Sequence, residues 1–305
     1  MTTTAGLKKR VLVLSSVLVL GACSMSSQPE TVLVGGATGR QGAAVVAELL
    51  ERGYRVRGLT RKPQSAKAQA LAARGVEVVQ GDYGDRVSLE AAMSGVNKVF
   101  FYSGFSRNEL QEGRNVIAAA EAARIEHLVY SSGAAAEPGK GIAGAKMTIE
   151  QEIVSGGVPY TVLRPVAFME NFDAMKKGIL ARGIIESRAP DRVLHFIAIR
   201  DIGLFVGEAF DNPGRWQGVA VNIAGDRMTV QQYVDIFSEV SGQAIGYQQL
   251  PLDEYLGTLP KPLRTLFRWY HEVGYEADVA QFRHEFPQLT TLREYLRATG
   301  WSDAD

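Results

Sequence analysis

Three glycines spaced three residues apart could hold the diphosphate of a dinucleotide. Gly36, Gly39 and Gly42 form the pattern G-x-x-G-x-x-G. Without β-carbons, these positions permit a tight turn, the close approach of a diphosphate and the close packing of a helix on a strand. A helix that begins at such a turn directs its free N–H groups and the positive end of its dipole toward the phosphates. The pattern predicts a dinucleotide-binding turn, with a purely structural turn as the alternative.

The residues on either side of the glycines predict the strand and helix that this chemistry requires. Residues 31–34 are a short apolar, β-branched run, and residues 43–52 carry apolar side chains at helical spacing. A second predicted strand over residues 54–60 follows at the distance of a βαβ unit. Other side chains inside the turn are expected to contact the same cofactor, and these are Thr38, Arg40 and Gln41.

Basic residues follow the second predicted strand, where the ribose of the cofactor's adenosine is recognised. The strand ends in Leu-Thr and continues into Arg61 and Lys62. An acidic residue there would bind the ribose 2′-hydroxyl of NAD, whereas a guanidinium suits the 2′-phosphate of NADP. We therefore expect NADP as the cofactor, with Arg61 as the selective residue and Arg40 as a second contact. The alternative is that Arg61 and Lys62 are a solvated pair at the start of a helix.

Four further apolar runs continue the alternation of strands and helices. They cover residues 76–80, 98–102, 127–131 and 159–164. Strands that alternate with helical patterns predict a parallel sheet covered on both faces. The predicted fold class is α/β, a Rossmann-type doubly wound sheet in which residues 31–171 form an NAD(P)-binding domain.

Residues 172–305 are predicted to form a smaller α+β lobe for a substrate or partner, interleaved with the sheet. The pattern includes a strand over residues 219–223 and an amphipathic helix over residues 229–241, with Thr229 as its N-cap. An aromatic cluster within residues 266–275 is interpreted as the core of this lobe. A roof over the substrate cleft is the alternative for the same cluster.

The composition argues against several classes of function. The chain has 33 basic and 33 acidic residues, and no basic tract stands out, so nucleic acid is not an expected partner. A single cysteine excludes an internal disulfide. The four histidines are scattered, which predicts no metal site, and no nucleophile with a neighbouring histidine base is found.

The N-terminal residues resemble a bacterial lipoprotein signal peptide over residues 1–22. A Lys-Lys-Arg head at residues 8–10 precedes an apolar run, and Leu-Gly-Ala-Cys at residues 20–23 resembles a lipobox. This resemblance predicts a lipid on Cys23, attachment to a membrane of the bacterial cell envelope, and a linker over residues 23–30.

Two other interpretations of the N-terminus stay open. Translation that starts at Met25 would give an ordinary lead-in for a cytoplasmic Rossmann protein. Alternatively, the apolar run is a core strand and Cys23 an ordinary buried thiol.

Several segments in order along the chain resemble the NmrA-like family, an atypical branch of the short-chain dehydrogenase/reductase superfamily. The resemblance covers about residues 31–301. It implies an NADP-binding Rossmann domain with a smaller C-terminal lobe. Members of this family include regulatory and redox-sensing proteins as well as reductases of quinones. The segments are Val-Gly-Gly-Ala-Thr-Gly-Arg-Gln-Gly (34–42), Leu-Thr-Arg (59–61), Gly-Val-Glu-Val-Val-Gln-Gly-Asp (75–82), Val-Tyr-Ser-Ser (129–132) and Leu-Arg-Pro-x-x-Phe-Met-Glu-Asn (163–171).

The resemblance also implies roles for single residues. Asp82 matches the aspartate that reaches the adenine amine, although a helix cap is the alternative for this residue and the favoured role for Asp85. Pro165 and Phe168 would line the nicotinamide, and Asn171 would face the substrate cleft. Phe168 as core between the lobes is the alternative.

The catalytic expectation depends on Lys146. Active short-chain reductases use Tyr-x-x-x-Lys, in which the tyrosine transfers a proton while the lysine binds ribose hydroxyls and lowers the pKa of the tyrosine. Lys146 matches the lysine, but the tyrosine position holds Ile142, which cannot transfer a proton. A quinone is the acceptor that tolerates this loss best, because water can protonate its delocalised reduced form. The two hypotheses are an NADPH-dependent reductase of a quinone or similar small molecule, and a non-catalytic NADP sensor that acts through a regulatory protein partner.

Overall fold

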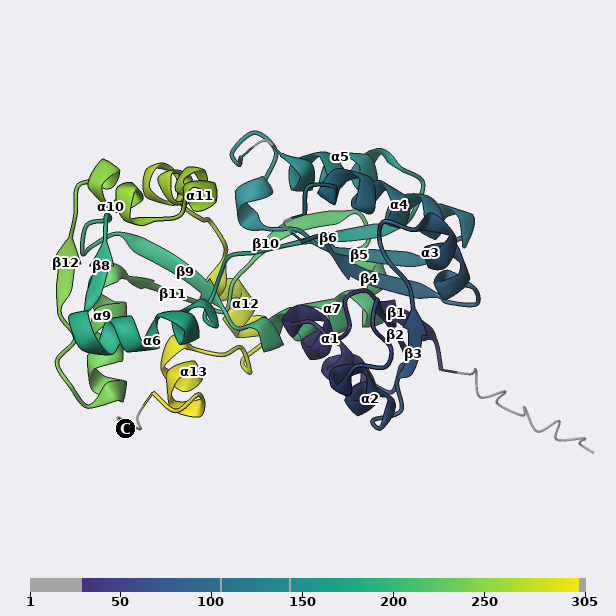
Figure 1. The fold of residues 1–305 in the computed structure, drawn as a ribbon, viewed down its shortest axis with the longest axis horizontal. Coiled ribbons are helices and arrows are strands. Elements are labelled where there is room, and N and C mark those ends of the chain that lie inside the picture. The colour runs from purple at the N-terminus through teal and green to yellow at the C-terminus, as the bar shows by residue number, and fades with distance from the viewer. Residues whose placement is uncertain (1–28, 105, 143, 302–305) are drawn as a thin grey trace, which may run out of the picture.

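The larger lobe is built around a seven-stranded parallel sheet (Figure 1). The computed structural model describes residues 29–104, 106–142 and 144–301. The strands lie in the order β10-β6-β5-β4-β1-β2-β3, and every neighbouring pair is parallel. Their bounds are β1 (Thr31–Val34), β2 (Arg55–Thr60), β3 (Glu77–Gln80), β4 (Lys98–Tyr102), β5 (His127–Ser131), β6 (Tyr160–Pro165) and β10 (Val219–Ile223).

The strand order reverses between β1 and β4, and this position selects the ligand edge of the sheet. β1 pairs with β2 on one side and with β4 on the other, so the connections diverge from it. In open α/β sheets, ligands bind beyond the carboxyl ends of the strands at such a switch point. The predicted α/β fold with a Rossmann-type sheet is therefore confirmed.

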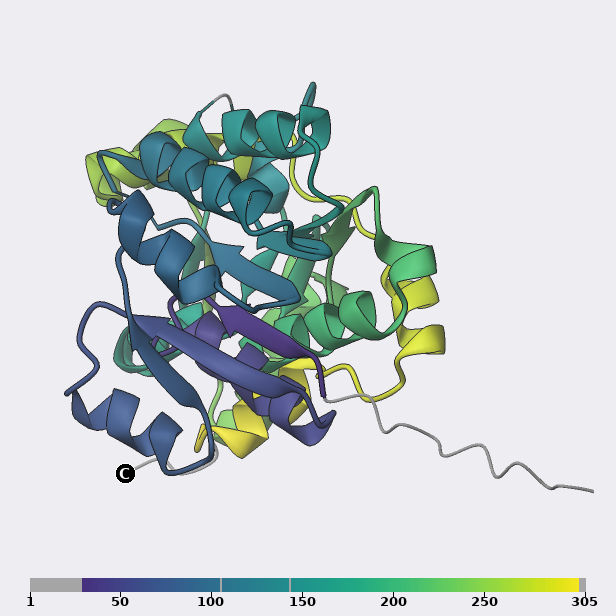
Figure 2. The same ribbon diagram turned by 90° about the vertical axis from the view of Figure 1, so that its right-hand side faces the viewer.

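Helices cover both faces of this sheet (Figure 2). One layer holds α1 (Arg40–Glu51), α2 (Ala66–Ala72) and α7 (Ile199–Asp211), and the other holds α3 (Arg86–Met93), α4 (Glu109–Ala122) and α5 (Ala145–Ser155). Small residues set the helix spacing: a β-carbon on Gly203 of α7 would lie 2.8 Å from the Ala44 carbonyl oxygen of α1, and one on Gly113 would lie 2.5 Å from Ile149 of α5. Each layer thus packs closely enough to bury its own apolar cluster against the sheet.

The smaller lobe contains two short sheets and a helical cover. β7 (Ala167–Phe168), β9 (Val193–Ile197) and β11 (Asp226–Thr229) form one sheet, and β8 (Ile184–Glu186) pairs with β12 (Tyr247–Gln249). Its core includes a ring cluster of Phe172, Phe196, Tyr233, Phe237 and Trp301. The remaining elements are η1 (Ala134–Ala136), α6 (Asn171–Arg182), α8 (Pro213–Trp216), α9 (Val230–Ser241), α10 (Leu252–Thr258), α11 (Lys261–Glu272), α12 (Val279–Glu285) and α13 (Leu292–Ala298).

Local signals for the elements mostly hold. Asp85 caps α3 by accepting from the N–H groups of Val87 and Ser88, as predicted, and Thr229 caps α9 in a capping box. The strand over residues 219–223 is present, but it is an edge of the large sheet rather than part of the smaller lobe.

The predicted signal peptide at residues 1–22, Cys23 and Met25 lie outside the described residues, so the lipoprotein interpretation stays a prediction. Within residues 29–104, 106–142 and 144–301, no helix is both long and apolar enough to span a membrane.

Candidate functional site

The glycine turn connects β1 to α1 at the ligand edge of the sheet. Gly36 has φ +61°, a conformation that favours glycine, and the Gly39 N–H donates to the Gly36 carbonyl oxygen at 2.8 Å. A β-carbon on Gly42 would lie 2.2 Å from that same carbonyl oxygen. Gly39 is the N-cap of α1 and has no side chain to cap it. The first-turn N–H groups of α1, which have no intrahelical acceptors, therefore fit an anionic group such as a diphosphate.

Tyr102 lies against this turn from the end of β4. Its hydroxyl donates to the Gly36 carbonyl oxygen at 3.4 Å, and a β-carbon on Gly39 would lie 2.3 Å from the hydroxyl. Burial raises the pKa of Tyr102, so its hydroxyl keeps its proton at neutral pH. The sequence treated Tyr102 only as a strand residue, and alternation along a buried strand gives no signal that would have singled it out.

The other residues of the turn face in different directions. Gln41 accepts a hydrogen bond from the Ser131 hydroxyl at 2.8 Å, which ties α1 to the end of β5. Arg40 is exposed, and its charge acts on Glu170 and Tyr295 of the smaller lobe. Burial raises the pKa of Glu170, and the positive charge of Arg40 opposes this shift. Arg40 therefore lies where the two lobes meet, and Thr38 is half-buried in the turn itself.

Arg61 and Asp82 lie at the ends of neighbouring strands. Arg61 is exposed directly after β2, and the Gly81 N–H donates to the Thr60 carbonyl oxygen at 3.1 Å, which holds the two strand ends together. The Asp82 carboxylate accepts from the Gly84 N–H at 2.8 Å. The adenine and ribose roles of these residues stay predictions.

Lys146 lies in the first turn of α5 and is held by residues that follow β4. Its Nζ donates to the Ser103 carbonyl oxygen at 2.8 Å, to the Ser103 hydroxyl at 2.8 Å and to Glu109 Oε1 at 2.6 Å. Desolvation lowers the pKa of Lys146, and the hydrogen bond and charge of Glu109 oppose that shift. Lys146 is therefore a mostly buried cation at the C-terminal ends of β4 and β5.

A tyrosine hydroxyl reaches the same cluster from inside the sheet. The Tyr130 hydroxyl lies 2.8 Å from Ser103 Oγ, and the Tyr130 ring stacks on Phe101 with ring centroids 4.6 Å apart. Tyr130 is fully buried, and desolvation raises the pKa of its hydroxyl. Tyr130 lies within a strand and Glu109 at the start of a helix, and neither has a sequence pattern that marks it as a site residue.

The position of the usual proton-transferring tyrosine lies outside the helix. Ile142 precedes α5, and its N–H donates to the Ala135 carbonyl oxygen at 2.5 Å. Lys146 lies in the first turn of α5, whereas Ile142 lies in the loop before that helix. The two residues are therefore not one helical turn apart, although they are four positions apart in the sequence.

The predicted nicotinamide and substrate residues follow β6 into the smaller lobe. Pro165 ends β6 and is buried, Phe168 in β7 packs on the core of the larger lobe, and Asn171 is exposed at the start of α6. These three residues therefore line the passage of the chain from one lobe to the other. Their nicotinamide and substrate roles stay predictions.

The predicted aromatic cluster joins the lobes near this edge. Trp269 Nε1 donates to the Lys140 carbonyl oxygen at 2.8 Å, and the Trp269 and Tyr275 ring centroids are 5.2 Å apart. Lys140 Nζ also pairs with Glu276 at 2.9 Å. A small cavity of about 50 Å³ lies beneath, lined in part by Ala134 and Trp269.

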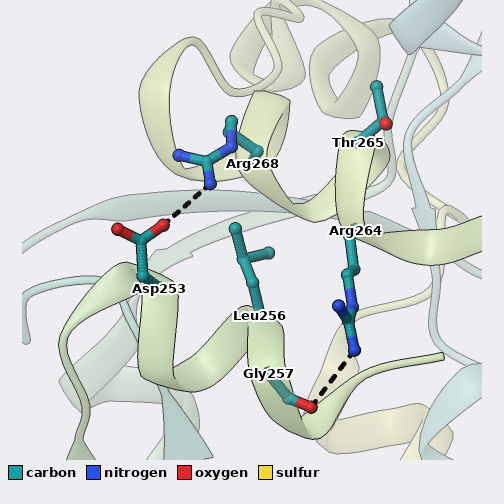
Figure 3. A pocket seen from close by; sticks show the side chains of 6 residues that line it. All are labelled: Asp253, Leu256, Gly257, Arg264, Thr265 and Arg268. Atoms are coloured by element: carbon teal, nitrogen blue, oxygen red, sulfur yellow. Dashed lines mark hydrogen bonds and ion pairs between the residues drawn. The ribbon is translucent and has the colours of Figure 1, made fainter. Parts of the chain in front are cut away.

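A larger hollow of about 290 Å³ lies elsewhere, between α10 and α11 of the smaller lobe (Figure 3). Arg268 pairs with Asp253 at 2.8 Å, and Arg264 donates to the Gly257 carbonyl oxygen at 3.4 Å. The charged groups of this hollow thus have partners already, and none of the predicted site residues lines it.

The chain is similar in sequence to proteins of known family. The model of the NmrA-like family matches residues 28–296. A (4-alkanoyl-5-oxo-2,5-dihydrofuran-3-yl)methyl phosphate reductase of Streptomyces griseus is 33 % identical over 226 residues, 73 % of this chain and 78 % of the relative. Quinone oxidoreductase 2 of Escherichia coli strain K12 is 30 % identical over 233 residues, 75 % of this chain and 80 % of the relative.

The fold comparison includes an NADPH-dependent quinone oxidoreductase from Escherichia coli, solved in complex with NADPH. Its TM-score is 0.76 and its sequence identity is 27 %, and the match covers 88 % of this chain and 99 % of that one.

Proposed function

The chain belongs to the NmrA-like family, and we propose that it is an NADPH-dependent reductase of a quinone or a similar small acceptor. The observation that carries the proposal is the position of Lys146. Its ammonium lies at the same edge of the sheet as the glycine turn, against the loop that follows β4. A dinucleotide whose diphosphate binds the turn would extend across that edge.

The residues present fit a dinucleotide. The diphosphate would be held by the first turn of α1 with Gly36, Gly39 and Gly42, and the ribose near the nicotinamide by Lys146. A reduced nicotinamide supplies a hydride when it is bound. The proposed set of further cofactor contacts comprises Thr38, Arg40, Gln41, Arg61, Asp82, Pro165 and Phe168, with Asn171 toward the acceptor.

NADP rather than NAD is proposed as the cofactor because of Arg61. The side chain is exposed beyond β2, and the end of that strand is tied to the turn by the hydrogen bond from the Ala37 N–H to the Leu59 carbonyl oxygen at 3.2 Å. A guanidinium at this place suits a 2′-phosphate. The quinone oxidoreductase with a similar fold was solved with NADPH, which supports the same choice.

The acceptor class follows from the chemistry at residue 142. Ile142 cannot give a proton to the alkoxide that forms when a ketone is reduced. The reduced form of a quinone is a delocalised phenolate, so its protonation does not depend on a tyrosine at that position. The relatives named as a quinone oxidoreductase and as a (4-alkanoyl-5-oxo-2,5-dihydrofuran-3-yl)methyl phosphate reductase also support a small-molecule acceptor.

Titration calorimetry and a quinone panel test the proposal on the full chain. We expect NADPH to bind, NADPH oxidation to depend on a quinone, and Lys146→Ala to lower turnover. Binding of NADPH without turnover on any acceptor would favour the alternative, a non-catalytic NADP sensor with a protein partner, for which the absent tyrosine is the supporting observation. Absence of binding would refute both functions.

We also propose attachment to a bacterial envelope membrane through a lipid on Cys23, on the basis of the lipobox-like sequence. Mass spectrometry of the purified N-terminus distinguishes an acylated Cys23 from a chain that begins at Met25 in the cytoplasm. A diacyl mass on Cys23 is the expected result.

A further inference from the structure

A carboxylate lies beside Lys146, and the family pattern gave no role to it. Glu109 Oε1 is 2.6 Å from Lys146 Nζ, and their side chains are 10 % and 18 % exposed. The Ser103 hydroxyl joins the pair, because it donates to Glu109 Oε1 at 2.7 Å and accepts from Lys146 at 2.8 Å. The three groups form a closed hydrogen-bonded cluster at the ends of β4, α4 and α5.

Glu109 is the carboxylate that accepts a hydrogen bond from Lys146. Glu150 lies one turn further along α5, and its charge also raises the pKa of Lys146, but its carboxylate is paired with Arg164 of β6 at 2.7 Å. Tyr130 of β5 reaches the cluster only through Ser103 and keeps its proton.

The charge balance of the site differs from that of a Tyr-x-x-x-Lys pair. In such a pair the lysine stabilises a negative tyrosine, and the two groups together transfer a proton. Ile142 has no ionisable group, so a buried Lys146 would lose its proton unless another anion faced it. The ion pair with Glu109 provides that anion from a different helix.

We propose that Glu109 is a positioning residue that holds Lys146 protonated, so that Lys146 supplies the proton to the reduced acceptor in place of the absent tyrosine. This inference rests on the proposed reductase function. Hydride transfer from a reduced nicotinamide adds two electrons and one hydrogen to a quinone, which leaves a hydroquinone anion. The N–H of Lys146 that donates to the Ser103 carbonyl oxygen turns to the product, and this N–H bond breaks as the O–H bond of the product forms, while the other two N–H groups stay on Ser103 Oγ and Glu109. Water returns a proton to the neutral amine, while Glu109 keeps its negative charge.

The first test measures the amine of Lys146 without any ligand. Competitive acylation of the full chain over a pH series, followed by mass spectrometry, gives the fraction of Lys146 that is neutral. In Glu109→Gln we expect acylation about tenfold faster at a fixed pH below the midpoint, since loss of an adjacent opposite charge shifts a pKa by about one unit or more. Glu112→Gln is the matched control, because Glu112 lies on the same helix but is half-buried and accepts a hydrogen bond from the Ser106 hydroxyl instead.

Glu109→Asp keeps the negative charge but moves it away from Lys146, because the aspartate side chain is shorter. The acylation rate of Lys146 in this variant should therefore lie between the rates in the wild type and in Glu109→Gln. It also serves if Glu109→Gln does not fold. Acylation of Lys146 at the wild-type rate in the folded variants would overturn the proposal.

The second test uses the pH profile of quinone-dependent NADPH oxidation. With Lys146 as the acid, turnover falls as the pH rises through its pKa, and Glu109→Gln should move that limb about one unit toward lower pH. A limb that does not move would count against the role of Glu109. Absence of turnover in the wild type would refute the reductase function, whereas the acylation test would still decide whether Glu109 controls Lys146.

Discussion

Removal of Arg164 is expected to destabilise the protein by about 3–5 kcal/mol, because it leaves a buried carboxylate without its partner. Arg164 and Glu150 are 8 % and 1 % exposed. The guanidinium reaches Glu150 Oε2 from Nε at 2.8 Å and from Nη2 at 2.7 Å. Glu150 Oε1 has no hydrogen-bond partner among the described residues. Loss of Arg164 would therefore remove the only hydrogen bonds that the described residues donate to the Glu150 carboxylate.

A double-mutant cycle separates the pair from the packing of its side chains. Arg164→Met keeps most of the apolar stem, Glu150→Leu removes the charge, and the double variant removes both. The double variant should lie within about 1 kcal/mol of the wild type, since an apolar replacement of a buried ion pair is often neutral or stabilising. The pair would then show a coupling energy of at least about 2 kcal/mol.

Reversible urea unfolding of the full chain, followed by tryptophan fluorescence and circular dichroism, gives the free energies. Arg86→Met is the matched control, because Arg86 pairs with Glu90 at 2.7 Å but the two side chains are 54 % and 41 % exposed. It should cost less than about 1 kcal/mol. A cost below about 1 kcal/mol for Arg164→Met as well, or a double variant as unstable as the single one, would refute the reasoning.

Three further predictions concern the turn, the cofactor and acid stability. Gly42→Ala would place a β-carbon 2.2 Å from the Gly36 carbonyl oxygen, and the forced shift should cost about 1–3 kcal/mol in urea unfolding and weaken NADPH binding in calorimetry. Arg61→Asp should lower the affinity for NADP more than that for NAD, by about tenfold or more, and equal losses for both would contradict the assignment. Burial, with a smaller effect of Lys98, lowers the pKa of His127 from 6.5 to about 4. The unfolded chain therefore takes up this proton first, so stability is full above about pH 6.5 and falls by about 3 kcal/mol as the pH decreases toward 4. In His127→Asn, the free energy of unfolding should decrease less between pH 6.5 and pH 4, as measured by urea unfolding at several pH values. The same decrease in the variant and the wild type would refute this prediction.

Elements with local signals were predictable from the sequence. Examples are the apolar run before Gly36 and the helix caps Asp85 and Thr229. Each depends only on residues a few positions away in the sequence, so its effect does not depend on the rest of the fold. The turn at the G-x-x-G-x-x-G pattern was equally predictable, because a tight turn and a close approach of the backbone require glycine in any fold.

Contacts between distant segments were not predictable in the same way. β10 pairs with β6 after more than fifty intervening residues, and no short-range pattern distinguishes that partner from a strand of the smaller lobe. Glu109 has an ordinary sequence context, an acid in the first turn of a helix. It becomes buried beside Lys146 because α5 packs on α4, with Ile149 closely against Gly113. Tyr102 gains its place on the glycine turn through the pairing of β4 with β1.

The path of the chain between its lobes has a practical consequence for work with fragments. After β6 the chain enters the smaller lobe, returns to supply α7 and β10, and leaves again for β11. A shortened gene product that ends at residue 171 would lack both α7, which packs on α1, and the strand that covers the edge of β6. Such an uncovered strand edge invites aggregation, so expression of the Rossmann segment alone is expected to yield insoluble material. Co-expression with the complementary half would restore the missing strand and helix, which makes split-protein reconstitution the workable format.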